Sequence, residues 1–170
     1  MRYIMKSGFL SEEGKILAEI KIPFSGNLKT VFLPDNGKSY EISVSDPSGM
    51  GDVRYKSYAL TGSDGKVIVE GRPGYASEDD LDTIGWPAYR LPKTDHADIK
   101  IGSEKYVLTM HNSLNYSMKN SQGNTVLQVM HTEISGGWTI DAPDNFSPEI
   151  ITGLFIFCRY IEQENEFIVG

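Results

Sequence analysis

The first 145 residues alternate between short runs of β-branched and aromatic residues and turns rich in Gly, Asn, Asp and Pro. A period of two residues bounded by such turns is typical of half-buried antiparallel strands. Three weaker runs lie near Tyr3, Val31 and Tyr89. With them, the pattern predicts about twelve strands, and the clear ones span 16–22, 40–44, 53–60, 66–70, 97–101, 105–111, 114–118, 125–130 and 138–140.

Two parts of this pattern resemble each other. Residues 58–69 and 116–127 both read as a strand, a turn containing Gly, and a strand, with Gly65 aligned to Gly123. Glycine supplies the positive φ that a hairpin turn requires. The alignment is explained either by an internal duplication or by the general likeness of any two hairpins.

Residues 71–98 differ from the rest of the chain. They are rich in Pro, Gly, Asp and Glu, and we expect a long irregular connection with at most one short strand. Tyr75, Trp86 and Tyr89 give the segment aromatic anchors that a free linker between domains would lack.

The hydrophobic period changes near the end of the chain. Ser147-Pro148-Glu149 offers a capping hydroxyl, a proline at the first helical position and an acid in the first turn, which predicts a helix over about 147–163. Its polar residues fall on one narrow stripe that includes Arg159, whose head group we expect at solvent. A helix that is apolar over most of its circumference must be surrounded by protein.

The strands and the helix together predict the fold. A helix with its side chains is about 10–12 Å across, so a barrel that encloses one must have more strands than an eight-stranded barrel. We therefore predict a mainly β protein, a closed antiparallel barrel of about twelve strands around the hydrophobic C-terminal helix, as a single domain over 1–170. The alternative is a two-sheet sandwich capped by the helix, which requires only one apolar helix face.

The composition of the chain indicates its cellular location and the kinds of partner that it can bind. The chain has 170 residues, a net charge of −7 and one cysteine, Cys158. No apolar segment of a secretory signal is seen, and no disulfide can form within the chain, so we expect a cytoplasmic protein. The acidic balance disfavours nucleic acid and predicts no strong binding to anionic membranes.

The order of these parts resembles the tubby C-terminal-like superfamily, which includes plant LURP-one-related proteins and phospholipid scramblases. The similarity lies in the two repeated hairpins, in residues 138–140 and in the helix 147–161. The resemblance implies a closed barrel threaded by the helix. It does not carry a function over, because the family's phosphoinositide readers use clustered basic residues, and here these are scattered singly as Lys15, Lys21, Lys29, Arg54, Lys56 and Lys66.

Two groups of residues were considered as metal ligands. The densest acidic cluster contains Glu78, Asp79, Asp80 and Asp82, but it lacks the alternate spacing of a calcium loop. The histidines His96, His111 and His131 could form a zinc site with Glu133 or Asp141, but no pair has the spacing of metal ligands. We therefore predict no metal and no cofactor.

The remaining chemistry is limited. We expect Cys158 to be a buried, unreactive thiol, because its neighbours in the helix are apolar. Trp86 and Trp138 are candidates for a ligand groove, although aromatic residues of strands more often pack in the core.

These observations favour a non-enzymatic binding or scaffolding domain of unknown partner. A second hypothesis is a binder of a small apolar or lipid ligand. A third is a hydrolase that uses acidic residues such as Glu78, Asp80 or Asp141.

Overall fold

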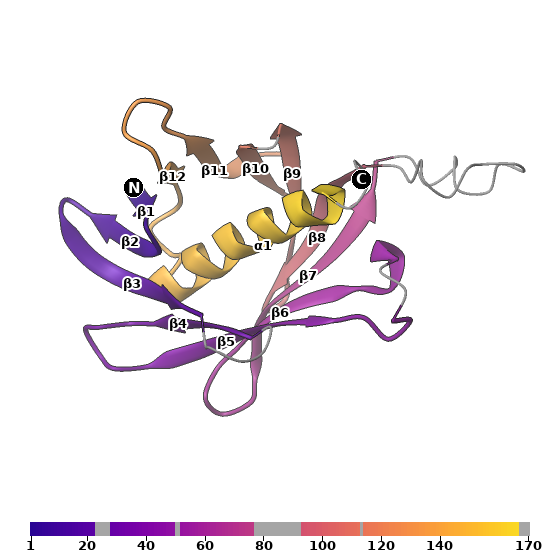
Figure 1. Cartoon of the computed structure of the whole chain (residues 1–170), viewed down its shortest axis with the longest axis horizontal. Coiled ribbons are helices and arrows are strands. Elements are labelled where there is room, and N and C mark those ends of the chain that lie inside the picture. Colours follow the sequence, from indigo (N-terminus) through magenta and orange to yellow (C-terminus); the bar gives the residue numbers. More distant parts are fainter. Residues whose placement is uncertain (23–27, 50–51, 77–92, 113, 167–170) are drawn as a thin grey trace, which may run out of the picture.

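The protein is described by a computed structural model that covers residues 1–22, 28–49, 52–76, 93–112 and 114–166. Every strand pairs antiparallel with its neighbours along the chain, and β1 closes the ring on β12 (Figure 1). The strands are β1 (Arg2–Lys6), β2 (Phe9–Glu12), β3 (Lys15–Lys21), β4 (Lys29–Phe32), β5 (Ser39–Ser45), β6 (Ser57–Thr61), β7 (Val67–Tyr75), β8 (Thr94–Ile101), β9 (Glu104–Asn112), β10 (Asn115–Asn120), β11 (Thr125–His131) and β12 (Trp138–Asp141). A short 3-10 helix, η1 (Val53–Tyr55), precedes β6.

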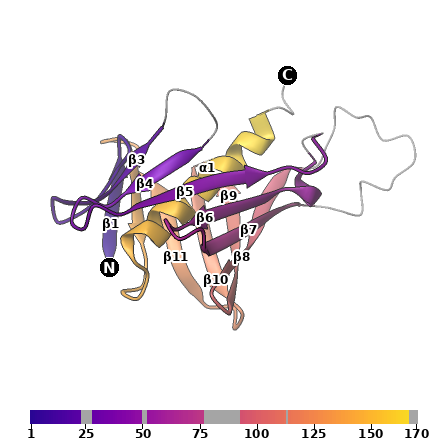
Figure 2. The same ribbon diagram turned by 90° about the horizontal axis from the view of Figure 1, so that it is seen from below.

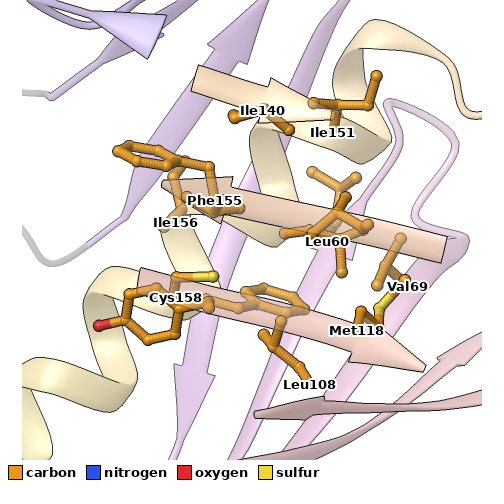
Figure 3. Close-up of a cluster of buried hydrophobic side chains, with 14 of the residues drawn as sticks. Leu60, Val69, Leu108, Met118, Ile140, Ile151, Phe155, Ile156 and Cys158 are labelled. Atoms are coloured by element: carbon orange, nitrogen blue, oxygen red, sulfur yellow. The ribbon is translucent and has the colours of Figure 1, made fainter. Parts of the chain in front are cut away.

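The predicted closed barrel around a C-terminal helix is confirmed, and the sandwich alternative is wrong. The helix α1 (Pro148–Glu166) crosses the molecule inside the ring of strands (Figure 2). Every residue from Ile151 to Cys158 is buried, because strands surround the helix. Figure 3 shows inward-facing side chains such as Leu60 and Met118 around the helix residues Ile151 and Phe155.

Glycine allows the helix to approach the strands closely. A Cβ atom at Gly71 would lie 3.0 Å from Cδ2 of Phe157, and one at Gly153 would lie 3.1 Å from a methyl group of Leu60. Larger residues at these positions would push the helix away from the strands. The barrel interior is therefore filled by packed side chains.

The antiparallel order gives the barrel two different ends. At the tight-turn end, the connections 13–14, 33–38, 62–66, 102–103 and 121–124 have six residues or fewer, and α1 begins there. At the opposite end, the loop end, β1, β3, β5, β7, β9 and β11 end, the strand that follows each of them begins, and α1 ends. The three widest separations in sequence between consecutive strands, 22–28, 46–56 and 76–93, are flanked by strands that meet at this end.

The two hairpins that resemble each other in sequence also match in structure. In β6–β7, Leu60 pairs with Val69 and the register shifts directly after Leu60. In β10–β11, Met118 pairs with Leu127 and the register shifts directly after Met118. The expected strand–turn–strand units are therefore confirmed, with the same register and the same bulge.

Some strand predictions were wrong. Residues 53–55 form η1 instead of a strand. The strand β2 was missed because its flanking turns use Ser7 and Glu13 at positive φ, where hairpins favour Asn or Asp. The candidate near Tyr89 lies outside the described residues.

The segment 71–98 was also misjudged at both its ends. Its first five residues complete β7, and Thr94 begins β8. Pro73 is accommodated because the ladder between β6 and β7 ends at Gly71, so no β6 residue pairs with the proline.

Candidate functional site: a basic pocket at the loop end

The tryptophan chosen from the sequence as a ligand candidate packs onto the helix. The Trp138 ring lies 5.0 Å from the Phe155 ring and 5.2 Å from the His131 ring, measured between centroids. Its Nε1 donates to the Leu114 carbonyl at 3.2 Å. Trp138 thus belongs to the wall of the core, whereas the other candidate, Trp86, lies outside the described residues.

The candidate metal ligands do not converge. Glu78, Asp79, Asp80 and Asp82 lie outside the described residues. His96 is 2.7 Å from Asp95, His111 is 2.6 Å from Ser117, and His131 packs on Trp138. Among the residues that the structure describes, no group of three or more His, Cys, Asp or Glu side chains could hold a metal ion.

Of the four residues considered for catalysis, Glu78 and Asp80 lie outside the described residues, while Cys158 and Asp141 have ordinary structural surroundings. Cys158 is fully buried in α1, and burial raises the pKa of its thiol, which keeps it in the unreactive protonated form. Asp141 accepts a hydrogen bond from Arg2 Nε at 2.9 Å, and this bond lowers the pKa of the carboxyl group.

The expectation for Arg159 was wrong in part. Its side chain is only 27% exposed, because the guanidinium stacks on Trp138 and forms an ion pair with Glu162. The head group therefore belongs to the packed loop end of the barrel and is not free in solvent.

A largely buried ion pair with both residues of intermediate exposure ties the last turn of α1 to the loop end. Lys56 Nζ lies 2.6 Å from Glu164 Oε2, and both side chains are less than 15% exposed. The Tyr58 hydroxyl donates to the other oxygen of Glu164 at 3.2 Å. Asn165 exchanges two hydrogen bonds of 2.8 Å with the Thr94 backbone. The bonds of Asn165 hold the end of α1 on β8, and Glu164 on the same turn holds the Lys56 amine.

A pocket of about 520 Å³ opens between the loop 46–56 and β7. The three charged residues that the structure describes in its lining are all basic: Arg54, Lys56 and Arg72. Pro47, Ser48, Tyr55 and Ser57 complete the lining. Tyr55 is 59% exposed, and the Arg54 guanidinium lies 5.7 Å from its ring centroid. The pocket thus combines three cations, two serine hydroxyl groups and an accessible tyrosine ring; the Ser48 hydroxyl donates to Asp46 at 2.7 Å.

The acids that balance these cations lie outside the lining. Asp52 accepts from Arg54 NH2 at 2.7 Å, Glu70 accepts from Arg72 Nε at 2.9 Å, and Glu164 accepts from Lys56. The Arg54 hydrogen bond lowers the pKa of Asp52, so this carboxylate stays ionised and holds the guanidinium in place. Asp52 also caps η1 by accepting from the Arg54 backbone N–H at 3.0 Å.

Two other hollows differ from this basic pocket in charge. A hollow of about 630 Å³ at the tight-turn end contains Arg2 and also its partner Asp141. A groove of about 530 Å³ on the outer face of β7–β9 contains Arg72, Lys100 and Lys105 together with Glu70 and Asp98. In both of these hollows, acidic side chains share the lining with the basic ones.

Sequence reasoning missed the basic pocket because its residues lie in different elements. Arg54 and Lys56 precede β6, whereas Arg72 follows the next hairpin turn. Tyr58 pairs with Gly71, so the residues just before Tyr58 and just after Gly71 are neighbours. The hairpin turn at Gly65 and the alternation of the two strands beside it predict the register of this hairpin. From that register, the proximity of Arg72 to Lys56 could have been predicted.

The comparisons with known proteins do not assign the chain to a family. Models of protein families, curated proteins and solved structures were compared with it, and none matches. The one α-helix that the structure describes is not long and apolar enough to cross a membrane.

Proposed function

We propose that this protein is a non-enzymatic binding domain, built as a tubby-like barrel, that recognises an oxyanion such as a phosphate or carboxylate group in the basic pocket. The observation that carries the proposal is the pocket lining, which, among the residues that the structure describes, has three cationic side chains and no acid. Cationic donors around a concave site are the usual means of holding such a group.

Donors remain available in spite of the ion pairs. A guanidinium has five N–H groups, and Arg72 uses only Nε toward Glu70 in the bonds described. Its side chain is 73% exposed, so the other N–H groups can turn toward a ligand. Lys56 has three N–H donors, one of which is directed to Glu164. The exposed Tyr55 ring offers a surface for a flat part of the same ligand.

The two other functions considered from the sequence have weaker support. A small apolar ligand would need an apolar pocket at a mouth of the barrel, whereas the pocket at the loop end is lined by three cationic side chains. A hydrolase would need a paired acid and base, but Asp141 is bound to Arg2 at the tight-turn end. In the outer groove, Glu70 pairs with Arg72, while Asp98 faces Arg72 across the strands, which is ordinary cross-strand charge pairing.

Calorimetric titration with inorganic phosphate and pyrophosphate at fixed ionic strength tests the proposal. We expect saturable binding that Arg72→Gln weakens at least about fivefold. Arg2→Gln is the matched control, because Arg2 is similarly exposed and also has a carboxylate 2.9 Å from its Nε. Absence of saturable binding, or equal affinities for Arg72→Gln and the wild type, would contradict the proposal.

A sedimentation assay with vesicles of anionic phospholipid separates a free ligand from a lipid head group. Because the net charge is −7, we expect the protein to remain in the supernatant at physiological salt. Co-sedimentation that Arg72→Gln abolishes would identify the oxyanion as a lipid head group held in the same pocket.

A further inference from the structure

Lys29 is an inward-facing lysine at the loop end of the barrel. It lies two residues before Val31, which is fully buried, so the alternation of β4 directs both side chains inward. Its partner across the sheet is Ile42, which is also fully buried. Lys29 therefore occupies a register position that the rest of the barrel fills with apolar residues.

The surroundings of Lys29 provide aromatic and positive groups. Its Nζ lies 4.9 Å from the centroid of the Tyr160 ring. Among the described residues, no carboxylate lies within ion-pair distance of it. The Tyr160 hydroxyl is buried and lacks a hydrogen-bond partner in the same part of the chain. Burial, and secondly the charge of Arg159, lower the pKa of the Lys29 amine.

Lys56 occupies a position similar to that of Lys29, but its charge is balanced by a carboxylate of the same chain. Lys56 also lies at the loop end, two residues before the buried Tyr58, and its charge is matched by Glu164 at 2.6 Å. Lys29 stands two residues before a buried strand residue in the same way, but an aromatic ring takes the place of the carboxylate. Within the part of the chain that the structure describes, the two lysines differ by one negative charge, which Lys56 has beside it and Lys29 does not.

We propose that Lys29 anchors a second oxyanion site inside the mouth of the barrel, in which an external carboxylate or phosphate group supplies the missing charge. The Tyr160 hydroxyl is the second donor available there. This site is independent of the basic pocket, since the two share no residue.

Stability provides the first readout. A base whose pKa is lowered on folding destabilises the folded state at every pH at which it is protonated in the unfolded chain. Lys29→Met keeps the length of the side chain and removes the charge, so we expect a higher melting temperature in the absence of oxyanions. Lys21→Met is the matched control, because Lys21 also lies over an aromatic ring, at 4.3 Å from Phe32, but is exposed on the neighbouring strand.

The decisive experiment follows the side-chain Cε signal of Lys29 by NMR during titration with phosphate or with acetate, at constant ionic strength. We expect a saturable shift in at least one series that persists in Arg72→Gln, together with a rise in melting temperature that Lys29→Met loses and Lys21→Met keeps. The two series distinguish a phosphate group from a carboxylate as the preferred ligand. A Lys29 signal that follows that of Lys21 in both series, or a Lys29→Met protein with lower stability, would overturn the proposal.

Discussion

The two ends of the barrel are built by different means. At the tight-turn end, each connection between strands contains a glycine at positive φ, namely Gly14, Gly37, Gly65, Gly102 and Gly123. At the loop end, side chains hold the structure, as in the Lys56–Glu164 pair. Thr94, His131 and Tyr160, which carry buried polar atoms without hydrogen-bond partners among the described residues, also lie there. A glycine at positive φ thus occurs in every connection between strands at the tight-turn end. The loop end also has such glycines, among them Gly8 and Gly136, but it holds in addition the polar side chains that binding requires.

The largest effect is expected for the helix that joins the two ends. Phe155→Asp places a carboxylate at a site that is 6% exposed and removes a ring packed on Trp138. Loss of the ring alone costs about 3–5 kcal/mol, which with the buried charge approaches the stability of a typical domain, about 5–15 kcal/mol. We expect insoluble or unfolded protein by circular dichroism. Ile134→Asp, at a fully exposed loop position, should change stability by less than about 0.5 kcal/mol.

A folded Phe155→Asp protein with a melting temperature near that of the wild type would contradict the enclosed helix. It would mean that α1 lies at the periphery and does not join the two ends of a closed barrel.

The next effect concerns the side chains of the loop end. Glu164→Ala leaves Lys56 without its carboxylate and Tyr58 without its acceptor, so we expect a loss of about 3 kcal/mol in the free energy of unfolding. Glu70→Ala removes a carboxylate from the exposed Arg72, which should cost less than about 1 kcal/mol. Denaturant titration measures both values. Equal effects would show that burial at the loop end does not strengthen its ion pair.

A smaller effect is expected for the backbone of the tight-turn end. Gly65 has a φ of +79°, and a Cβ atom there would meet nothing within 4 Å. Gly65→Ala should therefore cost only conformational strain, about 1–2 kcal/mol, without a steric clash. Ser63→Ala, in the same turn, is the control and should be nearly neutral. A neutral Gly65→Ala would show that the turn tolerates another conformation.

The smallest effects compare one aspartate from each end. The pKa of Asp52 is lowered by hydrogen bonds from Arg54, and that of Asp141 by hydrogen bonds from Arg2. Both folded-state values lie below the unfolded value of about 3.9, so each contribution to stability is present above about pH 4 and is lost as the pH falls through the folded pKa. The difference in melting temperature between the wild type and Asp52→Asn or Asp141→Asn should therefore shrink in acid.

The phosphate affinities of the same two variants distinguish the loop end from the tight-turn end. Asp52→Asn releases Arg54 from its carboxylate and should strengthen phosphate binding in the basic pocket, whereas Asp141→Asn should leave it unchanged. If both variants bound phosphate as the wild type does, the pairing of Arg54 would not limit the pocket.

The architecture was predictable because local and global signals agree. The helix that begins near Ser147 is apolar on nearly all sides and can only be enclosed, and the glycine turns divide the remaining chain into strands. The prediction of an irregular segment over 71–98 failed at its N-terminal end, because glycine, which usually indicates a turn, is used there for close packing. Gly71 and Gly74 suggested an irregular segment, but glycine is required there because the rings of Phe157 and His96 would lie 3.0 and 2.5 Å from a Cβ atom.

The candidate site was less predictable than the fold. Arg54 and Arg72 are 18 positions apart in sequence, and only the register of β6 against β7 brings their elements together. Lys29 looked like a surface lysine, since its inward direction follows from β4, a short strand with a weak sequence signal. The sequence shows which residues carry charge, but it does not show which strands lie side by side and therefore which charged residues meet.

Amide NMR mapping of phosphate binding over both ends of the barrel tests most directly whether the loop end is the binding surface. We expect saturable shifts at the loop end, at Lys56, Ser57 and Arg72, and no shift at Gly14, Gly65 or Gly123 at the tight-turn end. Shifts spread evenly over both ends, or concentrated at the tight-turn end, would contradict the claim that the loop end is the binding surface.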